Sequence, residues 1–236
     1  SATVIYRTML TQSFDLKQGW NAVYLHVDAS YQTLNNLVGP GAPVATPIQE
    51  VWMWSPSAAT QQFVKTPQEP LDTDSHWSSW KRAATGSSKL QQLAGNVACL
   101  VYSTTDFTWN LKGRPVAPRH LWSVSGLNFV GFSTDPSTAP DFQAFLRESS
   151  VLLQNAEIYE YPGGELGPGN PSKIIAQRTT PVRRGRAYWI HTGDVYNRYY
   201  GPFEVFSATD RLAFGDSLSS GTLRLRNLTT NEVTVS

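Results

Sequence analysis

The chain has 236 residues, enough to bury a sizeable core as one large or two small domains. Charged residues make up only 16% of it, and the formal net charge of +1 provides no field for nucleic acid or an anionic membrane surface. The single Cys99 excludes an internal disulfide, and no apolar run approaches the roughly 18 residues of a membrane span. Low charge with abundant Ser, Thr, Asn and Trp is typical of exported bacterial β proteins, so we expect a secreted or cell-surface protein.

The first predicted element is an N-terminal strand within residues 1–12, because its apolar residues are β-prone and carry no helix signal. A Gln-Gly turn then leads into residues 19–28, which indicate a buried strand that opens with a tight glycine turn and ends at Asp28. Residues 31–38 follow as a short helix, with apolar side chains at i, i+3, i+6 and i+7 and Ser30 placed to cap it.

An aromatic strand comes after the helix. Its Trp52 and Trp54 are two positions apart, hence on one face, and residues 61–65 are its predicted hairpin partner. The sequence then predicts an irregular segment and two further strands: residues 69–88, 95–102 and 107–115.

The second part of the chain repeats the first. Four matched pairs share one separation of 107 positions: Asn21 with Asn128, Asp28 with Asp135, Trp52 with Tyr159, and Trp54 with Tyr161. Residues 141–146 repeat the short helix. Later, residues 95–101 match residues 185–191 at an offset of 90, so the first copy carries about 17 extra residues within its irregular segment.

This pattern predicts a mainly β protein with two pseudo-repeated units at residues 13–117 and 118–207, each with one short helix. We expect them to pack as a pseudo-twofold pair with their aromatic strands in a shared or facing core. Residues 208–236 change character, and 221–228 with 232–236 read as a β-hairpin. A lone hairpin is marginal in water, so we expect the start of an immunoglobulin-like β-sandwich domain in a longer chain. The alternative is an extra hairpin packed on the duplicated body.

Three short motifs carry a resemblance: Gly19-Trp20-Asn21, an aromatic strand ending in Ser55-Pro56, and Gly185-Arg186-Ala187-Tyr188-Trp189. Together they resemble the "GWN…GxxYW" β modules of large secreted or surface proteins of environmental bacteria, over roughly residues 13–206. Copy one departs from that pattern at Ala98-Cys99, where an aromatic pair would stand. The motifs mark structure rather than chemistry, so the resemblance implies an extracellular modular protein with no defined activity.

Catalytic and metal motifs are missing from the sequence. Its histidines are His26, His76, His120 and His191. They form no H-x-H or H-E-x-x-H spacing, and there is neither a G-x-S-x-G elbow nor a P-loop. We therefore expect no metal, no cofactor and no enzyme.

Two pairs of carboxylates need an interpretation. Asp28 and Asp135 lie at equivalent ends of the two copies, which indicates a shared turn-capping role. Asp72 and Asp74 would serve a glycosidase only if the fold placed them across a sugar.

The insertion at residues 69–88 is the predicted functional site, because residues present in only one copy are free of what the duplicated fold needs. Its candidate ligand-binding residues are Asp72, Asp74, His76, Trp77, Trp80, Lys81 and Arg82. Exposed Trp rings offer flat apolar faces to sugar rings, and the charged neighbours can hydrogen-bond hydroxyls. The same composition suits a protein-interface hot spot. The alternative is that Trp77 and Trp80 fold back as plugs for the sheet, since Trp is usually largely buried.

A basic cluster precedes the last strand of copy two: Arg178, Arg183, Arg184 and Arg186. It could bind an acidic polysaccharide or phosphate. Alternatively it is a solvated surface that pairs with nearby glutamates: Glu157, Glu160 and Glu165.

The favoured function is a non-catalytic extracellular binding or adhesion module whose ligand is a polysaccharide or cell-surface glycan. Self-association and contact with neighbouring domains of a longer chain are further expected partners, whereas nucleic acid and membrane insertion are not. The alternatives are a structural subunit of a surface layer, stalk or filament, and a polysaccharide-active enzyme.

Overall fold

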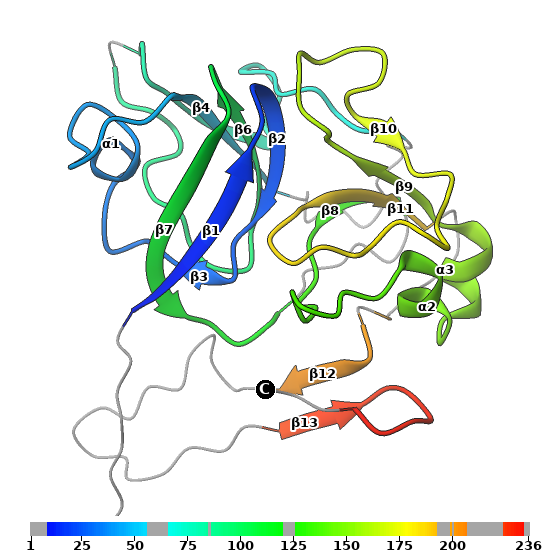
Figure 1. Cartoon of the computed structure of the whole chain (residues 1–236). Helices are drawn as coiled ribbons and strands as arrows, with labels where there is room; N and C mark the ends of the chain where they lie inside the picture. Colours follow the sequence, from blue (N-terminus) through cyan, green and yellow to red (C-terminus); the bar gives the residue numbers. More distant parts are fainter. Residues whose placement is uncertain are drawn as a thin grey trace, which may run out of the picture.

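Figure 1 shows the computed structural model of the chain, which describes residues 9–55, 66–84, 86–119, 126–192, 199, 201–206 and 224–233. The fold is mainly β, as predicted, with several antiparallel sheets and only short helices. The strands are β1 (Leu10–Leu16), β2 (Gly19–Tyr24), β3 (Val27–Asp28), β4 (Ile48–Trp54), β5 (Trp77–Lys81), β6 (Ala98–Ser103), β7 (Phe107–Pro115), β8 (Leu127–Val130), β9 (Glu157–Glu160), β10 (Ser172–Lys173), β11 (Tyr188–His191), β12 (Phe203–Phe206) and β13 (Arg224–Asn227). The helices are α1 (Leu34–Leu37), α2 (Phe142–Leu146) and α3 (Ser150–Asn155).

Copy one is built on an antiparallel sheet with the strand order β2-β6-β4-β5. Side chains alternate between its two faces, as the period of a strand requires. Trp20 and Tyr24 of β2 lie in one apolar cluster, whereas Val23 lies in another. Trp52 and Trp54 of β4 both belong to the first cluster, which confirms that they share a face. Both faces of this sheet are therefore buried.

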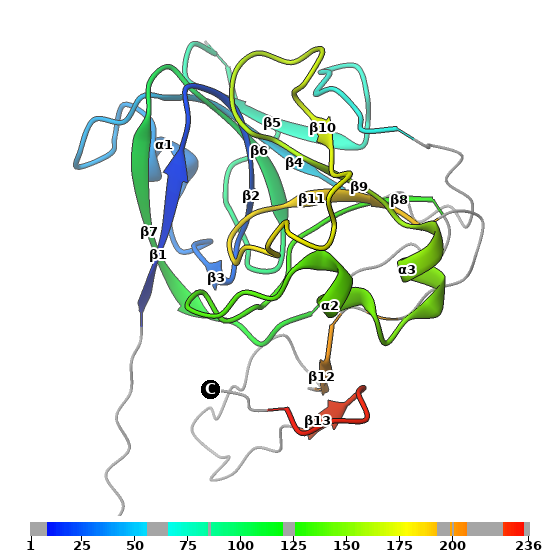
Figure 2. The same cartoon turned by 45° about the vertical axis from the view of Figure 1, so that its right-hand side comes forward.

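A second sheet, β1-β7-β3, covers one of those faces (Figure 2). Phe14 of β1 and Trp109 of β7 lie in the cluster between the two sheets, with ring centres 5.2 Å apart. Leu34 of α1 closes the same cluster and is fully buried. Copy one is thus a closed body around its own core, with the opposite face of its main sheet left for copy two.

Copy two carries a sheet with the order β8-β11-β9-β10. In sequence β8 is equivalent to β2, β11 to β6 and β9 to β4, so the two copies share one strand order. Such a shared order is what a duplication predicts, while the boundaries of the two units stay a prediction. Helices α2 and α3 lie against this sheet (Figure 2), where Phe142 meets Tyr188 edge to face at 5.0 Å.

The helices differ in detail from the prediction of one per copy. α1 begins only at Leu34, and its N-cap is Thr33 rather than Ser30. α2 begins at Phe142, one residue later than predicted, and Asp141 is its N-cap: the Asp141 carboxylate accepts a hydrogen bond from the Ala144 N–H at 2.7 Å. Copy two adds α3, which was not predicted and which starts at a capping Ser149.

The opening glycine turn occurs in both copies. Gly19 has φ 91° and Gly126 has φ 98°, a conformation that L side chains rarely adopt. Asn21 then locks the turn in copy one, because its Oδ1 accepts the Lys17 N–H at 2.8 Å and its Nδ2 donates to the Lys17 carbonyl at 2.7 Å. Asn128 is buried like Asn21. The matched Gly and Asn positions therefore serve the fold.

The two matched aspartates cap turns, as predicted. Asp28 Oδ1 accepts a hydrogen bond from the Ser30 N–H at 2.9 Å, and Asp135 Oδ1 accepts one from the Ser137 N–H at 2.8 Å. In both turns the aspartate side chain accepts a hydrogen bond from the backbone N–H two residues later, which is an Asx-turn. Hydrogen bonds from the Ser137 hydroxyl and N–H lower the pKa of Asp135.

The predicted offset of 90 for the last strand is wrong by one residue. The equivalent strand pairs are Trp52 with Leu100 in copy one and Tyr159 with Trp189 in copy two. Leu100 is thus equivalent to Trp189, an offset of 89 (189 − 100). Backbone conformation agrees, because Asn96 has φ 60° and Gly185 has φ 83°. The left-handed position is therefore filled by Asn96 in copy one, not by Gly95.

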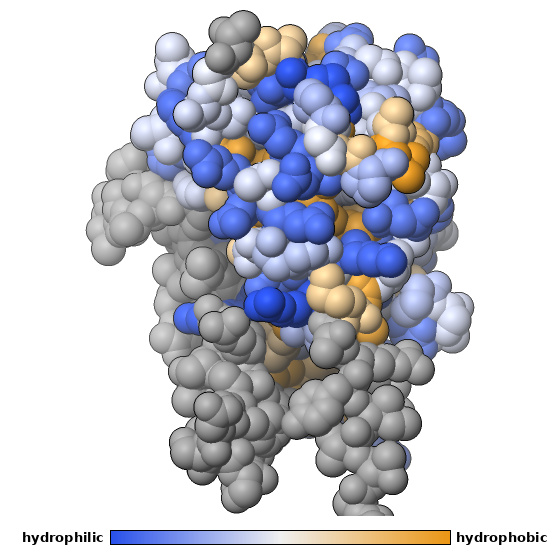
Figure 3. All heavy atoms as spheres, turned by 90° about the vertical axis from the view of Figure 1, so that its left-hand side faces the viewer, coloured by the Kyte–Doolittle hydropathy of each residue, from blue (hydrophilic) through white to orange (hydrophobic). Residues whose placement is uncertain are grey.

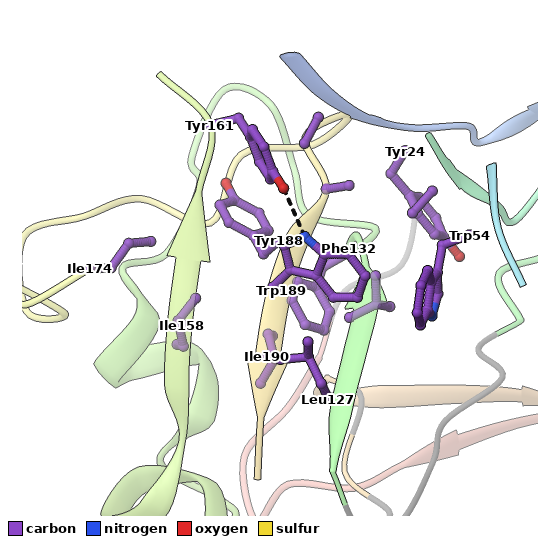
Figure 4. Close-up of a cluster of buried hydrophobic side chains, with 14 of the residues drawn as sticks. Tyr24, Trp54, Leu127, Phe132, Ile158, Tyr161, Ile174, Tyr188, Trp189 and Ile190 are labelled. Atoms are coloured by element: carbon purple, nitrogen blue, oxygen red, sulfur yellow. Dashed lines mark hydrogen bonds between the residues drawn. The ribbon is translucent and has the colours of Figure 1, made fainter. Parts of the chain in front are cut away.

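The aromatic faces of the two sheets meet in one shared core, as predicted. Trp189 of copy two lies 5.1 Å from Trp54 and 6.1 Å from Trp77 of copy one, both edge to face. On its other side Trp189 stacks on Phe129 at 4.4 Å. Its indole N–H donates to the Tyr161 hydroxyl at 2.9 Å, the bond dashed in Figure 4. This core joins the copies.

Equivalent residues of the two copies touch each other near the junction. Ser133 Oγ lies 3.3 Å from His26 Nδ1, and these two positions are 107 apart. Tyr24 and Gly131 are also 107 apart, and a Cβ atom on Gly131 would overlap the Tyr24 side chain. Two equivalent positions can meet only close to an axis that relates the copies, which supports the predicted pseudo-twofold packing. Tyr24 fills the space that Gly131 leaves.

Backbone hydrogen bonds also cross from one copy to the other. The Trp20 N–H donates to the Gly164 carbonyl and the Tyr24 N–H to the Gly185 carbonyl, each at 2.8 Å. The glycine-rich segment 163–169 lies in the loop between β9 and β10. The bond between Trp20 and Gly164 anchors this loop on β2.

The ends of the chain are only partly described. The predicted N-terminal strand lies mainly in residues 1–8, which are outside the described part. The predicted partner strand 61–65 is also outside it. At the other end β13 pairs with β12 of copy two. Residues 234–236 of the predicted partner strand lie outside the described part, so the predicted C-terminal hairpin stays a prediction.

Candidate functional site

The insertion contains a strand instead of the predicted irregular segment. β5 pairs with β4, with Trp77 opposite Trp54 and Trp80 opposite Val51. Residues three apart in a strand point to opposite faces, so Trp77 enters the core between the copies and Trp80 enters the core of copy one. Only 1% of Trp77 and 2% of Trp80 is exposed. An exposed sugar-stacking platform of these two rings is wrong, and the alternative that they plug the sheet is confirmed.

The charged residue of β5, the half-buried Lys81, is paired within the insertion. Lys81 Nζ lies 2.6 Å from the Asp72 carboxylate, which also accepts a hydrogen bond from Ser79 Oγ at 3.1 Å. The same ammonium group lies 4.8 Å from the centre of the Trp52 ring, within the range of a cation–π contact. The hydrogen bond from Lys81 lowers the pKa of Asp72. These groups hold the insertion together.

His76 is packed rather than presented to a ligand. Its ring stacks on Trp54 at 5.1 Å, and its Nδ1 lies 2.7 Å from Asp74 Oδ1. Partial burial opposes ionisation of Asp74, but the hydrogen bonds from the His76 N–H and ring outweigh it and lower the pKa. A glycosidase pair needs one carboxyl with a raised pKa. Asp72 and Asp74 both have lowered values, so they lack the acid of such a pair.

Arg82, the last predicted site residue, braces the chain around α1. Its guanidinium donates to the Ile48 carbonyl at 2.9 Å and to the Thr46 carbonyl at 3.0 Å, and it also contacts the Val38 carbonyl. Trp80, Lys81 and Arg82 do line a groove of about 360 Å³ beside the insertion. No aromatic face is open in it, because the Trp80 indole is buried and donates to Asn35 Oδ1 at 2.8 Å.

The remaining candidates for chemistry serve the fold. His26 and His191 are buried, and His120 lies outside the described residues. Burial raises the pKa of the Cys99 thiol to about 12, which makes it unreactive. Within the described ranges no cluster of three or more His, Cys, Asp or Glu side chains could hold a metal ion.

A larger groove lies in copy one, between the α1 region and β7. This α1–β7 groove has a volume of about 460 Å³, within the roughly 300–1,000 Å³ usual for ligand sites. One wall comes from residues 31–46 and the other from β7: Tyr31, Gln32, Asn36, Leu37, Pro43, Val44 and Thr46 face Phe107, Thr108, Trp109, Asn110 and Lys112. Figure 3 views this side of the molecule, where apolar patches lie among hydrophilic residues.

Aromatic and apolar surface is open at the rim of the groove. Tyr31 is 37% exposed and Val44 is 70% exposed, and Phe107 is half-buried. The Tyr31 hydroxyl donates to the Lys112 carbonyl at 3.0 Å, which fixes the ring across the groove. A ring held in place before binding loses little conformational entropy when a ligand stacks on it.

Neutral amides supply the polar groups of the groove. Gln32, Asn36 and Asn110 are exposed, and Lys112 is the one charged residue among those that line it. Asn110 Oδ1 accepts a hydrogen bond from Ser13 Oγ at 2.7 Å, so the orientation of this amide is fixed. Amides donate and accept equally. The groove is therefore suited to an uncharged ligand with hydroxyl groups and apolar ring faces.

Sequence reasoning missed this groove. Tyr31 was expected inside the short helix, but the helix begins three residues later and leaves the ring at the surface. The alternation of Thr108, Asn110 and Lys112 along β7 was a readable signal for one exposed face. Nothing in the sequence placed that face beside α1, which is 70 or more positions away.

Searches of known proteins add no relationship. Among the described residues no helix is long and apolar enough to cross a membrane. No family model, no curated protein and no solved structure matches this chain. The resemblance to "GWN…GxxYW" modules therefore stays a prediction, and a functional assignment depends on the α1–β7 groove itself.

Proposed function

We propose that this chain is a non-catalytic binding module of a secreted or cell-surface protein and that it binds a neutral carbohydrate in the α1–β7 groove. The observation that carries the proposal is the pairing of an open, fixed Tyr31 ring with the neutral amides of Gln32, Asn36 and Asn110. Sugars present apolar C–H faces and hydroxyl edges. A ring face and amide groups complement those two surfaces.

The composition of the whole chain supports the same ligand class. Charged residues are few in the chain, and Lys112 is the one charged residue among those that line the groove. A highly charged ligand would find only the Lys112 ammonium group as a complement here. The size of the groove accommodates part of an oligosaccharide, with the chain continuing over the open rim.

A glycan array tests the proposal. Wild-type protein is compared with Tyr31→Ala and with Phe206→Ala, a control on β12 that removes an aromatic ring of nearly equal exposure, 38% against 37%. We expect binding to neutral glycans that Tyr31→Ala reduces at least tenfold and Phe206→Ala leaves unchanged. An equal loss of binding in both variants would show that the α1–β7 groove is not the binding site. No binding to any neutral glycan would sink the function and favour the structural-subunit alternative.

A further inference from the structure

The two copies meet along a second depression, which is separate from the α1–β7 groove. Its walls are Ser13–Lys17 of copy one on one side and Arg183–Arg186 of copy two on the other, and its volume is about 240 Å³. We name it the junction cleft. Backbone bonds between the copies, such as that from the Tyr24 N–H to the Gly185 carbonyl, fix its two walls relative to each other.

Positive charge dominates the junction cleft. Lys17, Arg183, Arg184 and Arg186 line it, against the single carboxylate of Asp15. The Asp15 carboxylate already accepts a hydrogen bond from the Thr108 hydroxyl. Lys17 is also paired with Asp106 at 2.9 Å. The excess of positive charge in the cleft therefore comes from its three arginines, although the chain as a whole has a net charge of only +1.

The glutamates expected to neutralise this cluster are mostly used elsewhere. Glu157 pairs with Lys173 at 2.6 Å, and Glu165 accepts a hydrogen bond from the Tyr102 hydroxyl. Glu160 reaches Arg186 only at 4.0 Å. The predicted pairing of the arginines with these three glutamates is thus largely wrong.

Arg183 and Arg184 remain without an ion-pair partner in the described part of the chain. Both are exposed, so a ligand can reach them. The cleft walls partly desolvate Arg184 and lower its pKa, although a guanidinium stays charged at any physiological pH. A cation that has lost water and gained no counterion is stabilised most by an anion from outside.

We propose that the junction cleft binds the anionic groups of an acidic polysaccharide. Guanidinium groups bind carboxylate and sulfate groups through two parallel hydrogen bonds, and both groups occur on sugar chains. The volume holds one charged ring, while the polymer continues past the open ends. This site uses none of the residues of the α1–β7 groove, so it stands or fails independently of the neutral-glycan proposal.

Binding to polygalacturonate, which carries carboxylates, and to dextran sulfate, which carries sulfates, tests the proposal at two salt concentrations. The variant is Arg183→Gln/Arg184→Gln, and the control is Arg178→Gln, an exposed arginine outside the cleft. Charge-assisted hydrogen bonds are strong enough that we expect the double variant to weaken binding of at least one polymer by about tenfold or more. Arg178→Gln should leave the affinity within about twofold, and added salt should weaken it.

Three results would overturn the proposal. Binding of neither acidic polymer by wild-type protein would remove the ligand. If Arg178→Gln lost half as much binding free energy as the double variant, each arginine would contribute equally, which would show general surface attraction instead of a site. Stronger binding of poly-glutamate than of either polysaccharide would identify an acidic peptide as the ligand. Far-UV circular dichroism of each variant verifies that it is folded.

Discussion

The two tryptophans of the insertion are both buried, but within the described part of the chain only one of them has a hydrogen-bond partner for its indole N–H. Trp80 Nε1 donates to Asn35 Oδ1 at 2.8 Å, whereas Trp77 Nε1 has no hydrogen-bond partner among the described residues. Replacing each by Phe removes the same ring volume and the same N–H. The loss from ring size is shared, so the difference between Trp77→Phe and Trp80→Phe reports mainly on the hydrogen bond.

The magnitude follows from the cost of a buried polar group. Losing the Trp80 bond costs about 0.5–1.5 kcal/mol, whereas removing an unsatisfied buried N–H at Trp77 recovers about 1–3 kcal/mol. We expect Trp77→Phe to be more stable than Trp80→Phe by roughly 3 kcal/mol, or about 6–12 °C in Tm. Trp77→Ala should cost about 3–5 kcal/mol, because its ring contacts four aromatic rings of the shared core.

Urea unfolding followed by far-UV circular dichroism measures these differences without depending on Trp fluorescence. Unchanged m-values would show that the unfolded states are comparable. Equal free energies of unfolding for the two Phe variants would refute the reasoning on the N–H. A loss below about 1 kcal/mol for Trp77→Ala would refute its burial between the copies.

Three more results follow from the packing. Gly131→Ala should destabilise the fold by several kcal/mol in the same urea assay, because the new Cβ would overlap Tyr24 and lie 2.6 Å from the Arg186 carbonyl oxygen; an unchanged midpoint would contradict the contact between the copies. Cys99, with a pKa raised to about 12, should react with a thiol reagent at pH 8 only in urea. Since the folded pKa lies above the unfolded value of 9.0, its contribution to stability is full below pH 9 and is lost as pH rises towards 12, which a pH series of unfolding measures. Asp135→Ala should lower the urea midpoint by removing the turn bonds, and an unchanged midpoint would contradict that role.

Local chemistry made part of the fold predictable. A few neighbouring residues determine the positive φ at Gly19 and Gly126 and the turn bond of Asp28. The same holds for the face that Trp52 and Trp54 share. The period of a strand fixes which side chains share a face wherever the register is known. For the same reason the duplication at 107 positions could be read from matched polar and aromatic residues.

Long-range pairing was the part that the sequence did not reveal. Trp77 and Trp80 are three apart, a spacing that shows neither strand alternation nor a helix with caps, so β5 was expected as irregular chain. Only the pairing with β4 makes it a strand and buries both rings. The candidate site failed for the same reason. A sugar-stacking site there required exposed Trp rings, whereas Trp77 fills the core between the copies and Trp80 fills the core of copy one.

The α1–β7 groove depends on contacts of still greater separation. Tyr31 and Lys112 are joined by a hydrogen bond across 81 positions. The periodicity of apolar residues in the sequence does not predict a contact over such a separation. We therefore propose this groove, rather than the insertion, as the place where a ligand binds.

The most direct test of that replacement is a calorimetric titration with the best neutral oligosaccharide, comparing Tyr31→Ala in the groove with Lys81→Ala in the insertion. The account predicts at least a tenfold loss of affinity for Tyr31→Ala and an unchanged affinity for Lys81→Ala, whose ammonium group is already paired with Asp72. Lost affinity in Lys81→Ala with full affinity in Tyr31→Ala would contradict it and return the site to the insertion.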